Sequence, residues 1–197
     1  MSNSTKVCGV ILSGGRATRM DNQDKGLVEY KGRPLVSYAI AAMRPVVDQL
    51  IINANRNLDQ YQLFNLPVVT DQTSSFDGPL AGISTAMCYT KAKVLLVMPC
   101  DLPLIRPEHL QKLLSTCIEQ NTDIAVAYDG REIHPVLLAI KTSLQMDLQN
   151  YLDSGKRKVG LWLTHKKTLN VDFSTEPDIF TNINTIKELS ALEGRFC

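Results

Sequence analysis

The chain has 197 residues, of which 44% are hydrophobic and 21% are charged. Its 21 lysines and arginines nearly balance its 20 aspartates and glutamates, so the formal net charge is +1. This balance excludes nucleic-acid binding driven by bulk positive charge and an acidic disordered tail. At about 150 residues per domain, the length favours one domain spanning residues 1–197.

The five cysteines are scattered and form no C-x-x-C pair, which argues against a disulfide framework and against a zinc site. No apolar stretch reaches the roughly 20 residues that a membrane span needs, and the first residues lack the pattern of a signal peptide. We therefore expect a cytoplasmic protein that binds neither membranes nor nucleic acid.

Short apolar runs alternate with amphipathic segments along the first half of the chain, which is typical of βαβ units in a mostly parallel sheet. A polar loop over residues 13–33 separates the first strand from the first helix, and Pro34 is placed as the first residue of that helix. The predicted strands cover residues 6–12, 50–53, 67–70 and 94–99, and the predicted helices cover residues 34–43, 58–64 and 80–90.

In the second half, Pro107 is expected to open a helix that continues to about residue 118. The turn at residues 129–131 indicates a hairpin or mixed strand pairing rather than another crossover. Residues 158–164 fit a helix or a strand, and Thr185 begins a capping box for a last helix. The remaining elements are strands at residues 123–128, 136–140 and 169–172 and a helix at residues 143–152. The pattern predicts a single-domain, Rossmann-like α/β sandwich of three layers with a mostly parallel sheet.

Polar residues follow four of the predicted strands: Ser13, Asn53, Asp71 and Asp101. The carboxyl ends of parallel strands share one edge of the sheet, and ligands of such folds bind outside that edge. The sequence therefore predicts a single cleft that these four positions line. Taken singly, Asn53 and Asp71 are more often turn-forming or helix-capping residues.

The loop after the first strand combines two glycines with basic residues. The backbone amides of Gly14 and Gly15 can approach phosphate oxygens closely, and Arg19 and Lys25 would neutralise the charge of those oxygens. The loop matches neither the Walker A motif nor the dinucleotide-binding motif. It fits a triphosphate cradle, with a solvated surface turn as the alternative.

Asp101 directly follows the apolar run of residues 94–99. A carboxylate at the end of a buried strand is well placed to hold Mg²⁺ that also contacts nucleotide phosphates. The alternative is a helix N-cap, but the next helix is expected to begin at Pro107, too far along the chain.

Three further features have plain structural explanations. The basic run at residues 156–158 is usually a solvated face, although a phosphate-bearing second substrate would give it a use. Asn182 and Asn184 precede the last predicted helix and are more often turn residues than ligands. His134 stands alone on a strand, where a histidine is more often structural, and the spacing shows no Ser/His/Asp set.

Seven short motifs occur in a fixed order and spacing along the chain: Leu12-Ser13-Gly14-Gly15-x-x-x-Arg19-Met20, Asp24-Lys25-Gly26, Asn53-Ala54-Asn55-Arg56, Gly78-Pro79-Leu80-Ala81-Gly82, Pro99-Cys100-Asp101-x-Pro103, His134-Pro135 and Asn182-Ile183-Asn184-Thr185. Taken together, these motifs resemble those of the molybdenum cofactor guanylyltransferase (MobA) family of nucleotidyltransferases over nearly the whole chain. The opening loop indicates only the wider superfamily, whereas the two asparagine-rich motifs are much more specific to this branch.

The resemblance implies the nucleotidyltransferase fold and the transfer of GMP from GTP to the terminal phosphate of molybdopterin or its molybdenum-loaded form, with release of pyrophosphate. Mg²⁺ is the implied cofactor, with Asp101 as its ligand, and Lys25, Arg19 and Asp101 are the implied catalytic residues. The GTP-binding positions carried over are Leu12, Ser13, Gly14, Gly15, Lys25, Asn53, Asp71 and Asp101, and the pterin-binding positions are Arg157, Lys158, Asn182 and Asn184.

The sequence departs from the family pattern at three positions: Ser13 replaces the more usual Ala, Asp21 stands where Gly is common, and Lys158 stands where Arg can occur. Asp21 adds negative charge near a polyphosphate site, and Lys158 loses the bidentate geometry of Arg. The alternatives are a related nucleotidyltransferase that uses CTP or a sugar phosphate and a non-catalytic GTP-binding protein. Docking on molybdoenzyme-delivery proteins is compatible with catalysis.

Overall fold

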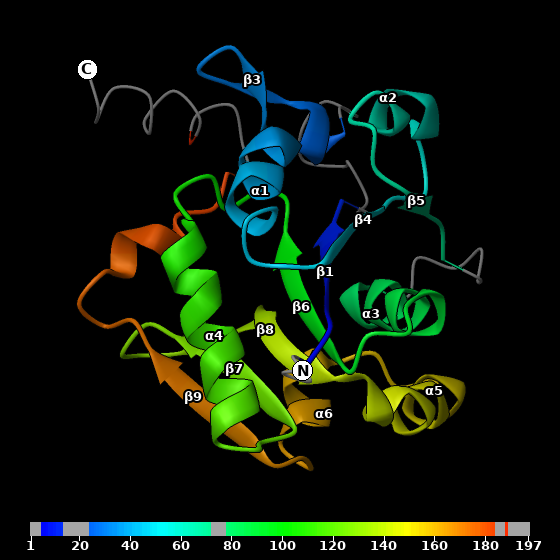
Figure 1. Cartoon of the computed structure of the whole chain (residues 1–197), viewed down its shortest axis with the longest axis vertical. Coiled ribbons are helices and arrows are strands. Elements are labelled where there is room, and N and C mark those ends of the chain that lie inside the picture. Colours follow the sequence, from blue (N-terminus) through cyan, green and yellow to red (C-terminus); the bar gives the residue numbers. More distant parts are fainter. Residues whose placement is uncertain (1–4, 14–23, 72–77, 184–187, 189–197) are drawn as a thin grey trace.

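The computed structural model describes residues 5–13, 24–71, 78–183 and 188 (Figure 1). Their main feature is a seven-stranded sheet in the order β5-β4-β1-β6-β8-β7-β9. Strand β8 is antiparallel to both of its neighbours, and every other pairing in this sheet is parallel. The strands are β1 (Val7–Leu12), β4 (Gln49–Asn53), β5 (Val68–Val69), β6 (Val94–Pro99), β7 (Ile124–Tyr128), β8 (Ile133–Lys141) and β9 (Thr168–Asp172).

Helices cover both faces of the sheet, which confirms the predicted three-layer sandwich. One face carries α1 (Leu35–Met43) and α4 (Pro107–Glu119), and the short α2 (Leu58–Gln62) adds its Tyr61 to the same core. The opposite face carries α3 (Pro79–Tyr89), α5 (Gln145–Asp153) and α6 (Val159–Leu163). Among the described residues, none of the helices is both long and apolar enough to cross a membrane.

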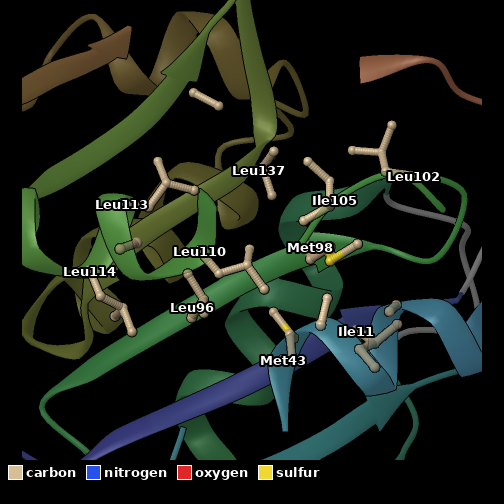
Figure 2. Packing of buried hydrophobic residues seen from close by; sticks show 14 of the residues in the cluster. Ile11, Met43, Leu96, Met98, Leu102, Ile105, Leu110, Leu113, Leu114 and Leu137 are labelled. Atoms are coloured by element: carbon tan, nitrogen blue, oxygen red, sulfur yellow. The ribbon is translucent and has the colours of Figure 1, made fainter. Parts of the chain in front are cut away.

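The two large core clusters lie on opposite faces of the sheet because the central strands are buried on both faces, and a third, small cluster joins Val28, Tyr30, Leu35 and Ile183. Along β6, Leu96 and Met98 point to the α1 and α4 side, whereas Leu95 and Val97 point to the α3 side. Figure 2 shows Leu96 and Met98 packed with Met43 of α1 and Leu110 of α4. A strand buried on both sides reads as a continuous apolar run, and this is why residues 94–99 predict β6 at its observed bounds.

Most predicted elements are confirmed, and the differences have local causes. The undecided segment at residues 158–164 contains the helix α6, which buries Trp162 and Leu163. Strand β8 begins at Ile133, three residues before the predicted start, because it continues the hairpin from β7. The helix predicted from Thr185 lies outside the described residues. The structure also contains three short 3-10 helices, η1 (Lys25–Leu27), η2 (Thr142–Leu144) and η3 (Pro177–Phe180).

The polar loop predicted for residues 13–33 is in part a small antiparallel hairpin of β2 (Glu29–Tyr30) and β3 (Arg33–Pro34). Its two-residue turn has positive φ angles at Lys31 and Gly32, of 48° and 70°. This is the backbone that twisted two-residue hairpins require. Pro34, expected as the first helical residue, instead ends β3 and is the N-cap of α1.

The core packing predicts a large difference between two leucine truncations. Leu110 of α4 is fully buried, whereas Leu63 is 78% exposed. Leu110→Ala should lower the free energy of unfolding by about 2–5 kcal/mol, because it removes buried methyl groups and leaves a cavity. Leu63→Ala, the matched control, should change it by less than about 0.5 kcal/mol. Urea unfolding measures both, and equal losses would contradict the packing described above.

Candidate functional site

The carboxyl ends of β1, β4, β5 and β6 meet at one edge of the sheet, as the sequence predicted. In the parallel register Leu12 faces Asn53 on one side and Pro99 on the other. The Ser13 N–H donates to the Asn53 carbonyl at 2.8 Å, and the Cys100 N–H donates to the Leu12 carbonyl at 3.1 Å. The backbone thus fixes the positions from which Ser13, Asn53 and Asp101 project.

Lys25 and Asp101 form an ion pair at this edge, with Lys25 Nζ donating a hydrogen bond to Asp101 Oδ2. Their side chains are only 27% and 13% exposed, so solvent screens the pair less than at an open surface. The N-cap of α4 is Arg106, which confirms that Asp101 does not cap that helix. The arrangement brings a cation and a carboxylate from distant segments to one point of the cleft edge.

Asp24 anchors the segment that carries Lys25. Its side chain is 1% exposed and accepts hydrogen bonds from Tyr61 Oη at 2.6 Å, Arg56 Nε at 3.2 Å and Asn57 Nδ2 at 3.2 Å. A buried carboxylate needs such compensation, because burying an unpaired charge costs several kcal/mol. Burial also raises the pKa of Tyr61, so its hydroxyl stays a donor. This anchoring role of Asp24 is not apparent from its motif, and its only signal in the sequence is Arg56 in a second motif.

Asn53 and Asp71 bind each other rather than cap helices. Asn53 Nδ2 donates to Asp71 Oδ1 at 2.8 Å. Asn55 closes a two-way contact, since its Nδ2 donates to Asp71 Oδ2 and its Oδ1 accepts from the Asp71 N–H, both at 2.8 Å. The network fixes a carboxylate and an amide at this edge of the sheet.

Helix α3 approaches this network at a glycine. A Cβ on Gly82 would lie 2.3 Å from Asn53 Oδ1 and 2.9 Å from a side-chain carbon of Leu12. Thr85, one turn along α3, donates from its hydroxyl to Asp71 Oδ1 at 3.4 Å. The absence of a side chain at residue 82 therefore lets the helix start pack directly on the Asn53 amide.

The oxygen groups at the edge suit a hard cation shared with phosphates. Asp101 offers a carboxylate, and the buried Ser13 Oγ has no hydrogen-bond partner among the residues that the structure describes. Within those residues there is no group of three or more His, Cys, Asp or Glu side chains that could hold a metal by itself. Mg²⁺ typically takes one or two carboxylates and completes its shell with phosphate oxygens and water, so this donor set fits it.

The neighbouring thiol does not compete for this chemistry. Cys100 is buried, and burial, together with the adjacent Asp101 carboxylate, raises its pKa to about 12. It is therefore a neutral thiol at physiological pH, and not a thiolate nucleophile.

The residues expected to bind the pterin are placed apart from one another. Asn182 lies close to the Asp101 backbone, because the N–H of the next residue, Ile183, donates to the Asp101 carbonyl at 3.2 Å. Arg157 uses Nη1 to bind the carbonyls of Leu152 and Lys156 at 2.6 and 2.8 Å, so it holds the turn after α5. Lys158 is exposed and is the N-cap residue of α6.

The end of α5 lies toward the start of α3. Gln145 of α5 contacts Cys88 near the end of α3, and Gln149 accepts from Ser84 one turn earlier in α3. The two helices are thus antiparallel, and the turn after α5 lies on the side of α3 where Gly82 packs on Asn53. The remaining site residues of the sequence analysis, Gly14, Gly15, Arg19 and Asn184, lie outside the described residues.

His134 is held on two sides. Its Nε2 lies 3.0 Å from Asp129 Oδ2, and its ring stacks on Phe180 at 3.8 Å with a 4° angle between the planes. Hydrogen bonds from the backbone N–H groups of Glu132 and Arg131, and from His134, lower the pKa of Asp129 to about 2. A carboxylate only accepts, so Nε2 carries the proton in this pair. The expectation of a structural role on a strand fits these contacts.

Comparisons with known proteins agree with this geometry. Residues 9–167 match the model of the MobA-like NTP transferase domain. The chain is 42% identical over 189 residues to the molybdenum cofactor guanylyltransferase of Shewanella sediminis, with 96% of each chain covered, and 41% identical to that of Shewanella loihica over the same share.

Two solved structures share the fold. One is a molybdopterin-guanine dinucleotide biosynthesis protein A from Archaeoglobus fulgidus, with a TM-score of 0.79, 21% identity and coverage of 96% of this chain and 98% of that one. The other is a Mycobacterium tuberculosis protein in complex with manganese, with a TM-score of 0.69, 19% identity and coverage of 96% and 99%.

The packing of α3 on the site predicts the effect of adding one methyl group. Gly82→Ala should lower the free energy of unfolding by about 1–3 kcal/mol, because the new Cβ displaces the Asn53 amide from its bonds. Gly160→Ala in α6 is the matched control, because a Cβ there meets nothing within 4 Å. The control should be neutral or stabilise by up to about 1 kcal/mol. Urea unfolding measures the stability of both variants. A Gly82→Ala protein as stable as the control would contradict the close approach of Gly82 to Asn53.

Proposed function

Since this chain belongs to the MobA-like NTP transferase family, we propose that it transfers the GMP moiety of GTP to the terminal phosphate of molybdopterin or of its molybdenum-loaded form. Pyrophosphate leaves, and a molybdopterin guanine dinucleotide forms. The observation that carries the proposal is the Lys25–Asp101 pair at the carboxyl ends of β1 and β6. It lies in a chain whose relatives over 96% of its length are molybdenum cofactor guanylyltransferases.

The reaction needs no protein base to activate its nucleophile. A phosphate monoester has a second pKa near about 6, so the attacking oxygen of the pterin phosphate is already anionic at neutral pH. The demand on the protein is then to hold two anionic substrates close together and in line, which positioning and charge neutralisation can meet. The polar groups of the cleft edge are suited to that task.

Lys25 and Asp101 would both help to neutralise the phosphate charge of the nucleotide, Lys25 directly and Asp101 by holding Mg²⁺. In the structure each neutralises the other, so neither is left as an uncompensated charge before the nucleotide enters. Bound Mg²⁺ would supply positive charge to the triphosphate oxygens. Asp101 is the residue that would hold it, and Lys25 Nζ, placed at the same point, would bind phosphate oxygens. Gly14, Gly15 and Arg19 would complete the cradle with backbone amides and a guanidinium.

The neighbouring groups would bind the nucleoside and the acceptor. Asp71 and Asn53 present acceptor oxygens that suit the N–H and O–H donors of guanosine. On the acceptor side, Asn182, Asn184 and Lys158 would contact the pterin substrate, with Lys158 as a point charge for its phosphate. Arg157 would act through the turn that it holds. We also propose a cytoplasmic location, because GTP is the donor substrate.

Pyrophosphate release tests this function directly. The purified protein should release pyrophosphate from GTP with Mg²⁺ only when molybdopterin is present, and ATP or CTP at equal concentration should give little. Preference for CTP would keep the transferase reaction and overturn the donor. Absence of release from all three nucleotides, with intact pterin and folded protein, would instead favour a GTP-binding protein without turnover.

Removing the Asp101 charge should nearly abolish transfer. Asp101→Asn keeps the shape of the side chain but loses the anionic ligand, so the single-turnover rate should fall by at least about a hundredfold. Asp59→Asn, at an exposed position of α2, is the matched control and should keep the wild-type rate. Thermal unfolding should show both variants folded. An Asp101→Asn rate equal to wild type would remove Asp101 from the metal role.

A further inference from the structure

Residues 176–183, here called the carboxyl-terminal strap, run from the start of α4 to the loop that carries Asp101. At one end Arg106 Nη2 donates to Glu176 Oε2 at 2.8 Å. At the other end the Ile183 N–H donates to the Asp101 carbonyl at 3.2 Å. The Ile183 side chain is fully buried and packs with Val28, Tyr30 and Leu35, next to the segment of Lys25. The strap therefore touches both segments that form the Lys25–Asp101 pair.

The middle of the strap rests on His134. Phe180 of η3 is 8% exposed and lies flat against the imidazole ring at 3.8 Å, so the ring supports one whole face of this side chain. Asp129 fixes the imidazole from the other direction through Nε2. Asp129 itself is held by the N–H groups of Arg131 and Glu132, both at 2.8 Å. Each contact restrains the orientation of the next side chain, and Phe180 also packs edge-to-face against Phe173, with ring centroids 6.0 Å apart.

Two anchors bracket Asn182. Phe180 is fixed on His134, and Ile183 is fixed on Asp101 by its N–H and in the cluster by its side chain. Three residues of extended chain span at most about 11 Å, so Asn182 has little freedom between these anchors. Asn182 directly precedes Ile183, whose N–H donates to the Asp101 carbonyl.

The sheet order separates His134 from the groups assigned to the nucleotide. Strands β1, β4 and β5 lie on one side of β6, whereas β8, with His134, lies on the other. Asp101, at the end of β6, thus stands between Asn53 and Asp71 on one side and the strap on the other. An in-line transfer places the attacking oxygen of the acceptor opposite the departing pyrophosphate. The strap lies on the side of β6 away from Asn53 and Asp71, so an acceptor bound there would not compete with the nucleoside for these groups.

We propose that His134 is a positioning residue for the acceptor substrate: its stack on Phe180 fixes the carboxyl-terminal strap and so sets Asn182 beside Asp101. The proposal rests on the proposed function, because it takes Asn182 as a contact of the pterin. It differs from a merely structural role in one respect. Loss of the stack should weaken the use of molybdopterin while the binding of GTP in its absence is unchanged.

Two substitutions separate the ring from its hydrogen bond. His134→Gln keeps a donor for Asp129 but removes the stacked ring, and His134→Phe keeps a ring but removes the donor. Exposed His165→Ala is the matched control. For each variant, pyrophosphate release gives KM for molybdopterin at saturating GTP, calorimetric titration with GTP and Mg²⁺ gives the nucleotide Kd, and thermal unfolding reports the fold.

His134→Gln should raise KM for molybdopterin by about tenfold, with an unchanged Kd for GTP. His134→Phe should recover most of this loss, and His165→Ala should match wild type. The proposal is overturned if His134→Gln leaves KM unchanged, if it weakens GTP binding as much as the use of molybdopterin, or if His134→Phe recovers nothing. Should His134→Gln fail to fold, Phe180→Leu removes the other half of the stack and is judged by the same criteria.

A second readout separates failure of this proposal from failure of the proposed function. In His134→Gln, hydrogen exchange at the Ile183 amide should be faster than in wild type, whereas exchange at the Cys100 amide, bonded to Leu12, should not change. Equal protection of Ile183 in both proteins overturns the positioning role, whatever the activity. A wild-type protein that releases no pyrophosphate contradicts the proposed function and with it the acceptor role of the strap.

Discussion

The parallel register of β1 with β4 and β6 is the constraint on which the site depends. It aligns Leu12 with Asn53 and with Pro99, so that three chain segments leave the sheet at the same level. The backbone bond from the Ser13 N–H to the Asn53 carbonyl extends this register one residue past β1, so the side chains of Ser13 and Asn53 are held at one level. The core that holds the register is apolar on both faces of β6. Hence the energy that fixes the site geometry comes from hydrophobic burial away from the site.

Charge at the cleft is balanced in two separate pairs, and the two have different consequences. Asp24 is almost fully buried and is satisfied by Arg56, Tyr61 and Asn57, so it is committed to the fold. The Lys25–Asp101 pair is partly exposed, and in the proposed function both members exchange their partner for a ligand of opposite charge. A permanent anchor directly beside an exchangeable pair allows Lys25 to change partners while its backbone stays in place.

The sequence predicts the elements and the common edge because both follow from local pattern. A buried apolar run predicts β6, and the carboxylate at its end makes Asp101 a candidate site residue. Neither prediction needs knowledge of the tertiary contacts. The hydrogen-bond and stacking partners of individual side chains cannot be predicted in this way when they are distant in the sequence. Asp24 and Tyr61 are 37 residues apart, and the stack of His134 on Phe180 joins a strand to a distant 3-10 helix. The β2–β3 hairpin was missed because each strand has only two residues, too few for a periodic signal.

The lone antiparallel strand β8 gives the sheet a functional division. On the β1 side of β6 the pairings are parallel, and the strand ends present Ser13, Asn53 and Asp71. On the other side, the reversal at β8 brings the β7–β8 turn to the same edge, beside the carboxyl ends of β7 and β9. That turn carries Asp129 and leads to His134, which supports a later segment of the chain. The turn therefore serves as a platform for the strap, and Asp101, at the end of β6, lies between this platform and the ends of β1, β4 and β5.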